Sequence, residues 1–138
     1  NGTQQKYEII KYLKKKSFTV IDLGNYNEKI KTDYNDVAQQ LGNIVNQDLK
    51  KNRGILICGT GIGMSMVANR NPKIRAGLCK DMETAQLTRA HNNANVLCLG
   101  ARVTDSDFIE AIVDTFLTTE FEGGRHEKRI KKINENLY

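Results

Sequence analysis

The sequence lacks the features that mark several common classes of protein. None of its apolar runs approaches the roughly 18 residues that predict a membrane span. Its opening residues, NGTQQKYEII, match neither a signal peptide nor a transit segment. An RNP motif, a zinc finger and a basic region followed by heptads are also absent. We therefore expect a cytoplasmic protein with no membrane partner and no nucleic-acid partner.

Cysteine is scarce, and its spacing excludes two structural uses. Cys58, Cys79 and Cys98 form no CxxC pair and have no histidine at zinc-finger spacing. We expect reduced thiols, with neither a disulfide framework nor a metal site. Cys79 and Cys98 lie in short apolar runs, where a free cysteine usually acts as a small core hydrophobe. Cys58 differs because glycines crowd the residues after it.

Charge is more abundant, with a formal net charge of +5. Such a balance suits anionic partners, from nucleic acids to anionic metabolites. The basic residues are scattered apart from a lysine triplet at 14–16 and the segment 125–132. A solvated helix face accounts for the triplet.

The order of predicted elements indicates the fold. Apolar periodicity predicts helices at 4–16, 34–49, 64–70, 81–91 and from 105, and strands at 18–23, 54–58, 74–78 and 96–99. Alternating helix and strand predicts an α/β fold, a doubly wound parallel sheet with helices on both faces. With one proline, Pro72, and no linker, residues 1–138 fit one domain that ends in a basic helix from about 125. Such folds normally begin with a strand, so we expect the first strand to be absent from this sequence.

The most informative stretch is ILICGTGIGMS, where the predicted strand ends at Cys58 and is followed by Gly59, Gly61 and Gly63. Glycines at alternate positions let a ligand approach the backbone, whose N–H groups can bind an anion. The stretch lacks the third glycine of a dinucleotide fingerprint and the GK[ST] of a Walker loop, so no cofactor is expected. A structural turn is the competing interpretation. A thiol at the carboxyl end of a parallel strand faces the crevice where these folds bind ligands, and as a thiolate it could act as a base.

Two further stretches carry candidate residues. In RAHNNANVLCLG a helix ends at His91, and a lone histidine at a helix end is more often a surface residue than a catalyst. Its position before a strand is not the carboxyl edge, so only a long loop or a neighbouring subunit would bring it to Cys58. In EFEGGRHEKRI, Arg125 and Arg129 share a helix face and suit a phosphate dianion, although a solvated basic tail is the simpler interpretation.

Together, CGTGIGMSMVANR, RAHNNANVLCLGAR and FEGGRHEKRI resemble the type B ribose-5-phosphate isomerases over nearly the whole chain. The resemblance implies a Rossmann-like fold and a metal-independent homodimer or homotetramer with active sites between subunits. It implies aldose–ketose isomerisation of ribose 5-phosphate and ribulose 5-phosphate, by proton transfer through an enediolate.

The resemblance also implies a role for each candidate residue. Cys58 is the expected base, Thr60 a proton relay, and His91 the ring-opening acid/base. The expected substrate-binding residues are Tyr34, Gly59, Gly61, Ile62, Gly63, Asn92, Arg102, Arg125 and Arg129, with His126 matching a residue of less certain purpose.

One departure from the family pattern lies at the front, where members carry a strand ending in Asp-His. Neither residue is present here. Two alternatives stay open: an isomerase of another sugar phosphate, such as allose or galactose 6-phosphate, or a non-catalytic phosphosugar-binding subunit.

Overall fold

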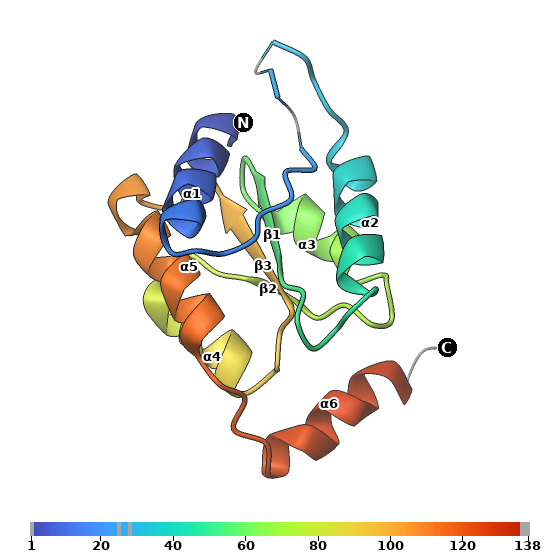
Figure 1. Ribbon diagram of the computed structural model, residues 1–138. Coiled ribbons are helices and arrows are strands. Elements are labelled where there is room, and N and C mark those ends of the chain that lie inside the picture. The colour runs from blue at the N-terminus through green and yellow to red at the C-terminus, as the bar shows by residue number, and fades with distance from the viewer. Residues whose placement is uncertain (1, 25, 28, 136–138) are drawn as a thin grey trace.

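Three parallel strands form the sheet at the centre of the fold. The computed structural model describes residues 2–24, 26–27 and 29–135. Within them, β1 (Gly54–Cys58), β2 (Ala76–Leu78) and β3 (Val96–Gly100) lie in the order β1-β3-β2 (Figure 1). Cys58 pairs with Gly100 in the register, so β1 and β3 end side by side. All five residues of β3 are buried, as expected for a central parallel strand covered on both faces.

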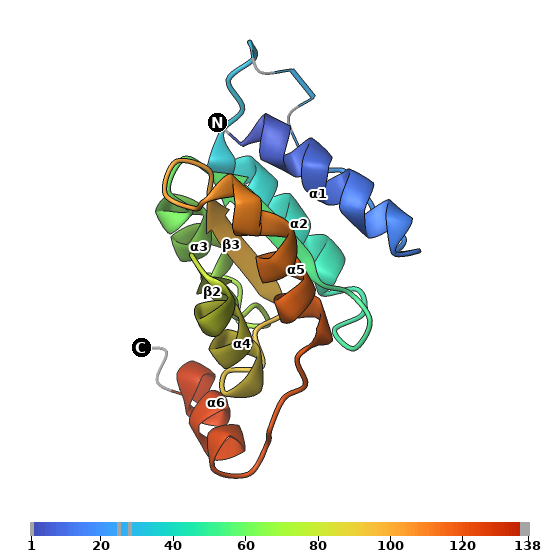
Figure 2. The same cartoon turned by 90° about the vertical axis from the view of Figure 1, so that its left-hand side faces the viewer.

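Helices cover both faces of this sheet (Figures 1 and 2). One face carries α1 (Thr3–Lys15), α4 (Met82–Ala90) and α5 (Ile109–Thr118), and the other carries α2 (Tyr34–Val45) and α3 (Ile62–Ala68). Alternation along β3 supplies both cores: Leu97 and Leu99 pack with the first set of helices, and Val96 and Cys98 with the second. The predicted fold class, a parallel α/β sheet with helices on both faces, is confirmed.

Most predicted elements are present with shifted ends. Asp81 begins α4 with a capping box, accepting a 2.8 Å hydrogen bond from the Thr84 N–H. Asp105 caps a short 3₁₀ turn, Ser106–Phe108, which leads into α5. The basic segment forms α6 (Arg125–Glu135), which extends past the sheet near the end of α4 (Figure 2). Among the described residues, no helix has the length and apolarity needed to cross a membrane.

The predicted strand at 18–23 is wrong. The segment belongs to no strand, although its β-branched residues favour extended backbone. A strand needs a partner about 4.8 Å away, whereas this segment and β1 both line a cleft of about 1020 Å³. The segment is held instead by packing of Val20 and Leu23 against the two cores and by a 3.0 Å ion pair between Asp22 and Lys6.

Candidate active site

Cys58 lies at the carboxyl end of β1, where the backbone turns into the glycine loop. Its side chain is half-buried, and the Gly61 N–H donates to its sulfur over 3.0 Å. Gly61 has a positive φ of 78°, and a Cβ there would lie 3.0 Å from the backbone carbon of Leu99. Glycine is therefore required at this position both for its backbone angle and for space. The loop thus holds a backbone donor against the thiol.

The rest of the loop is also closely packed. The Ile62 N–H donates to Thr60 Oγ1 over 3.3 Å, and Thr60 itself is exposed. A Cβ on Gly100, at the end of β3, would lie 2.5 Å from the Thr60 carbonyl oxygen. The loop therefore rests directly on the end of the neighbouring strand.

Arg102 and Tyr34 cover this loop from two other segments. The Arg102 guanidinium carbon would lie 3.3 Å from a Cβ on Gly59, and the Tyr34 ring 2.9 Å from a Cβ on Gly63. The Arg102 N–H donates to the Gly59 carbonyl over 2.9 Å, which fixes the turn after β3 against the turn after β1. A thiol, a hydroxyl, a phenol and a guanidinium therefore converge at the carboxyl edge, where parallel α/β folds bind their ligands.

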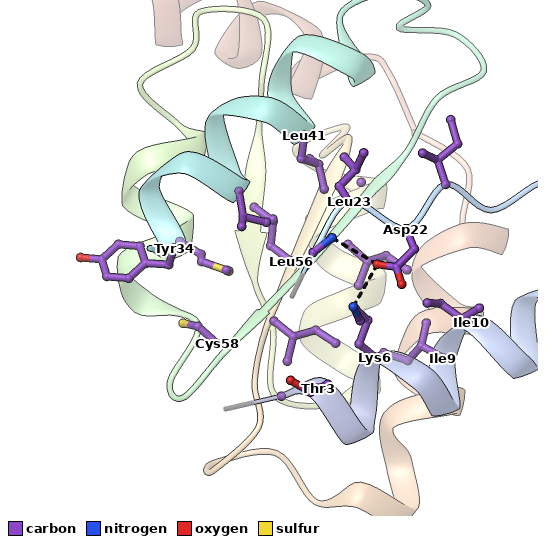
Figure 3. A pocket seen from close by; sticks show the side chains of 18 of the residues that line it. Thr3, Lys6, Ile9, Ile10, Asp22, Leu23, Tyr34, Leu41, Leu56 and Cys58 are labelled. Atoms are coloured by element: carbon purple, nitrogen blue, oxygen red, sulfur yellow. Dashed lines mark hydrogen bonds and ion pairs between the residues drawn. The ribbon is translucent and has the colours of Figure 1, made fainter. Parts of the chain in front are cut away.

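These residues occupy one end of the 1020 Å³ cleft. Figure 3 shows Tyr34 and Cys58 at this end and the Lys6–Asp22 ion pair away from them. Most of the remaining lining is aliphatic and comes from α1, α2, β1 and the segment 18–23. A polar ligand is therefore best accommodated at the Cys58 end.

A second group of predicted residues lies at the opposite end of the sheet. His91 and Asn92 follow α4 and precede the amino end of β3, while Arg125 and Arg129 are exposed on α6. Five residues at about 3.3 Å each separate this end of β3 from the carboxyl edge. Figure 2 shows α6 and the end of α4 far from the carboxyl end of β3. One chain therefore does not bring His91 to Cys58.

His91 is part of a cluster that sequence reasoning missed. Its Nε2 lies 3.7 Å from Glu122 Oε2, and His126 Nε2 lies 3.5 Å from the same oxygen. The two imidazoles stack with their centroids 4.3 Å apart and their planes 11° apart. His126 is buried, and this burial, with nearby His91 and Arg125, lowers the pKa of His126. The available signal was the spacing of Glu122 four residues before His126.

Arg89 is a second residue that the sequence analysis gave no role. Its guanidinium is buried and donates to the carbonyls of Ala94 and Thr119, over 2.6 and 3.3 Å, and to Asn93 Oδ1 over 2.9 Å. Desolvation, followed by the charges of other arginines, lowers the pKa of Arg89. The side chain joins the ends of α4 and α5 to the segment that leads into β3.

The His91–Glu122–His126 cluster is also the set of described residues that could hold a metal ion. The ligand atoms lie within 4.8 Å of one another. Zinc bound tetrahedrally at about 2.0–2.2 Å brings its donors to within roughly 3.5 Å, so these side chains would have to move closer.

A parallel α/β sheet with a thiol, a glycine-rich loop and an arginine at its carboxyl edge defines a class of protein whose ligand site combines a potential base with a cation. A family model described as Ribose/Galactose Isomerase matches residues 1–133. The chain belongs to this family. The resemblance to type B ribose-5-phosphate isomerases is thereby confirmed.

Individual relatives agree with this assignment. Ribose-5-phosphate isomerase B of Escherichia coli is 41% identical over 93% of this chain and 85% of its own length. D-erythrulose-4-phosphate isomerase of Pectobacterium atrosepticum is 43% identical over 93% of this chain and 84% of its own. The crystal structure of ribose-5-phosphate isomerase B from Mycoplasma genitalium, with bound ribulose 5-phosphate, superimposes with a TM-score of 0.93 at 44% identity, covering 97% of this chain and 88% of that one.

Proposed function

We propose that this chain interconverts ribose 5-phosphate and ribulose 5-phosphate by proton transfer through an enediolate. The observation that carries the proposal is the Cys58 sulfur at the carboxyl end of β1, with a loop N–H donated to it and with Arg102 and Tyr34 over the same loop. Relatives of the family named for this reaction, one with ribulose 5-phosphate bound, support the choice of substrate.

In the proposed chemical step, the Cys58 thiolate removes the proton from C2 of the open-chain aldose and returns it to C1. The electrons of the C2–H bond form the C1–C2 double bond of the enediolate. The loop N–H groups of 59–63 stabilise the negative oxygens, since preorganised donors act where charge develops. The Thr60 hydroxyl relays a proton between O1 and O2, and Tyr34 lines the sugar pocket.

Ring opening, and phosphate binding by the two arginines of α6, fall to residues at the other end of the sheet, while Arg102 binds the phosphate from the carboxyl edge. His91, with Asn92 beside it, acts as acid and base on the furanose, and the phosphate binds Arg102, Arg125 and Arg129. Charge-assisted hydrogen bonds from guanidinium groups suit a phosphate dianion. Because His91 and Cys58 lie at opposite ends of β3 in one chain, each site is formed between two subunits of a homodimer or homotetramer.

The proposed unit is one domain of residues 1–138, with its basic helix included. A reducing compartment such as the cytoplasm suits it, because Cys58 has to remain a free thiol to act as a base.

A tetrose phosphate is the second candidate substrate, favoured by the likeness to a relative named D-erythrulose-4-phosphate isomerase. Comparison of kcat/KM for ribose, allose and galactose phosphates and for erythrose 4-phosphate ranks these possibilities. A chain that binds ribose 5-phosphate but turns over none of these substrates would be a non-catalytic binding subunit.

The decisive test of the mechanism is Cys58→Ala. General acid–base catalysis contributes about 10²–10⁴-fold, so isomerisation should fall by at least about a hundredfold while ribose 5-phosphate still binds. Cys79→Ala, which shortens a thiol buried in the core formed with α1, α4 and α5, is the matched control and should keep its turnover per folded molecule. Near-normal turnover by Cys58→Ala would refute the assignment of the base.

A further inference from the structure

We infer that Glu122 is a positioning residue for His91, holding its imidazole for ring opening of the sugar. The inference rests on the ring-opening role proposed above for His91. Glu122 lies in the connection between α5 and α6. In this part of the sequence only the arginines that follow, Arg125 and Arg129, were predicted to bind substrate.

The backbone holds Glu122 in place beside His91. The Glu122 N–H donates to the carbonyl of Ala90, the last residue of α4, over 3.0 Å, so the two segments are joined next to the histidine. Gly123 and Gly124 follow with φ angles of 68° and 58°, and no atom lies within 4 Å of a Cβ built on either. The glycines are therefore needed for the left-handed turn, not for space. This turn directs α6 back so that His126 meets the same carboxylate.

The carboxylate determines which nitrogen of His91 is available. Glu122 Oε2 lies at ion-pair distance from Nε2 of His91, which favours a proton on that nitrogen. The lone pair is then on Nδ1. The buried His126 ring stacks on the other imidazole and restricts its rotation. A carboxylate beside the second nitrogen orients catalytic histidines in other enzymes, and here the carboxylate lies at ion-pair distance from that nitrogen.

The Glu122 carboxylate can also offset the positive charges around the cluster. Arg125 and Arg129 lie near enough to act on His126, and both are needed for phosphate in the proposed site. Ring opening breaks the C1–O4 bond, removes the O1 proton as the aldehyde forms, and delivers a proton to O4. An imidazole that takes the first proton becomes a cation among these arginines, and Glu122 offsets its charge.

Ring opening can be measured apart from isomerisation. The α and β furanoses of ribose 5-phosphate exchange only through the open chain, so exchange NMR of the anomers reports ring opening in a Cys58→Ala background where isomerisation is blocked. Cys58→Ala protein should accelerate anomer exchange over buffer. Adding Glu122→Gln should reduce this acceleration about tenfold at saturating substrate. The loss of a carboxylate partner of a metal-bound histidine lowers activity by a comparable factor.

Two variants and one affinity measurement separate positioning from structure. Glu127→Gln makes the same chemical change on an exposed carboxylate of α6 and should keep the acceleration within about twofold. Glu122→Asp restores the charge and should recover part of the loss. If Glu122 only anchored α6 and its arginines, Glu122→Gln would weaken ribose 5-phosphate binding and leave the saturated rate unchanged, which would overturn the inference.

The remaining outcomes distinguish this inference from the proposed function. Wild-type protein that does not isomerise ribose 5-phosphate refutes the proposed function. Active wild-type protein whose Cys58→Ala form does not accelerate anomer exchange refutes ring opening by His91, and the positioning role with it. An unchanged rate in Glu122→Gln, with the thermal melt also unchanged, refutes the positioning role alone.

Discussion

Mixing two chains that are each impaired by a different substitution tests whether each active site is formed by two subunits. Cys58→Ala removes the proposed base at the carboxyl edge, and Arg129→Ala removes a phosphate ligand on α6, beyond the other end of the sheet. Hydrogen bonds to charged groups contribute about 1.5–3 kcal/mol each, so Arg129→Ala alone should lower kcat/KM by about tenfold to a hundredfold. Random exchange in a two-fold dimer makes half of the dimers mixed, and each mixed dimer has one intact site. Activity should therefore recover to about a quarter of that of wild type.

The assay is the initial rate of ribulose 5-phosphate formation, measured before and after subunit exchange that is verified by native mass spectrometry. Each variant incubated alone under the same conditions is the control. Recovery has to scale with the fraction of mixed dimer. Complete exchange without recovery would mean that Cys58 and Arg129 serve the same site, or that α6 does not bind phosphate.

Three further perturbations test the local structure. Burial raises the pKa of the Cys79 thiol to about 11 and that of Cys98 to about 12, so both stay protonated at pH 8. Iodoacetamide should therefore modify Cys58 alone in native protein, which peptide mass spectrometry would detect. Equal modification of all three cysteines would contradict this burial. Arg89→Ala leaves buried carbonyls without a donor and should lower the free energy of unfolding by about 2–3 kcal/mol. Urea denaturation should show this as a lower midpoint. An unchanged midpoint would contradict the proposal that Arg89 holds the ends of α4 and α5 together. Gly61→Ala adds a Cβ at a left-handed φ and against the backbone of β3. The free energy of unfolding should therefore fall by about 2 kcal/mol or more, and the turnover should fall with it. A neutral effect on both would show that the loop can rearrange.

The segment 18–23 shows why propensity alone misplaces a strand. Its composition, FTVIDL, is that of a strand, and its backbone is not helical. A strand also needs a neighbouring chain at ladder distance, and composition does not specify one. By contrast, 54–58 and 96–99 form strands because continuous apolar runs are stable only where both faces are covered, which occurs inside a parallel sheet.

Local sequence determined the elements and the candidate chemistry of the carboxyl edge. The strand pattern places Cys58 and the end of β3 at the same edge, because the carboxyl ends of parallel strands lie at one edge of a sheet. The glycines after Cys58 predict the loop, because positive φ angles favour glycine. Only the tertiary structure decided which distant residues meet. It placed Arg102 and Tyr34 over the glycine loop, separated His91 from Cys58 by the length of β3, and brought Glu122 to His91 and His126. These contacts depend on how α2, α4 and α6 pack and turn, and periodicity along one segment carries no information about its neighbours in space.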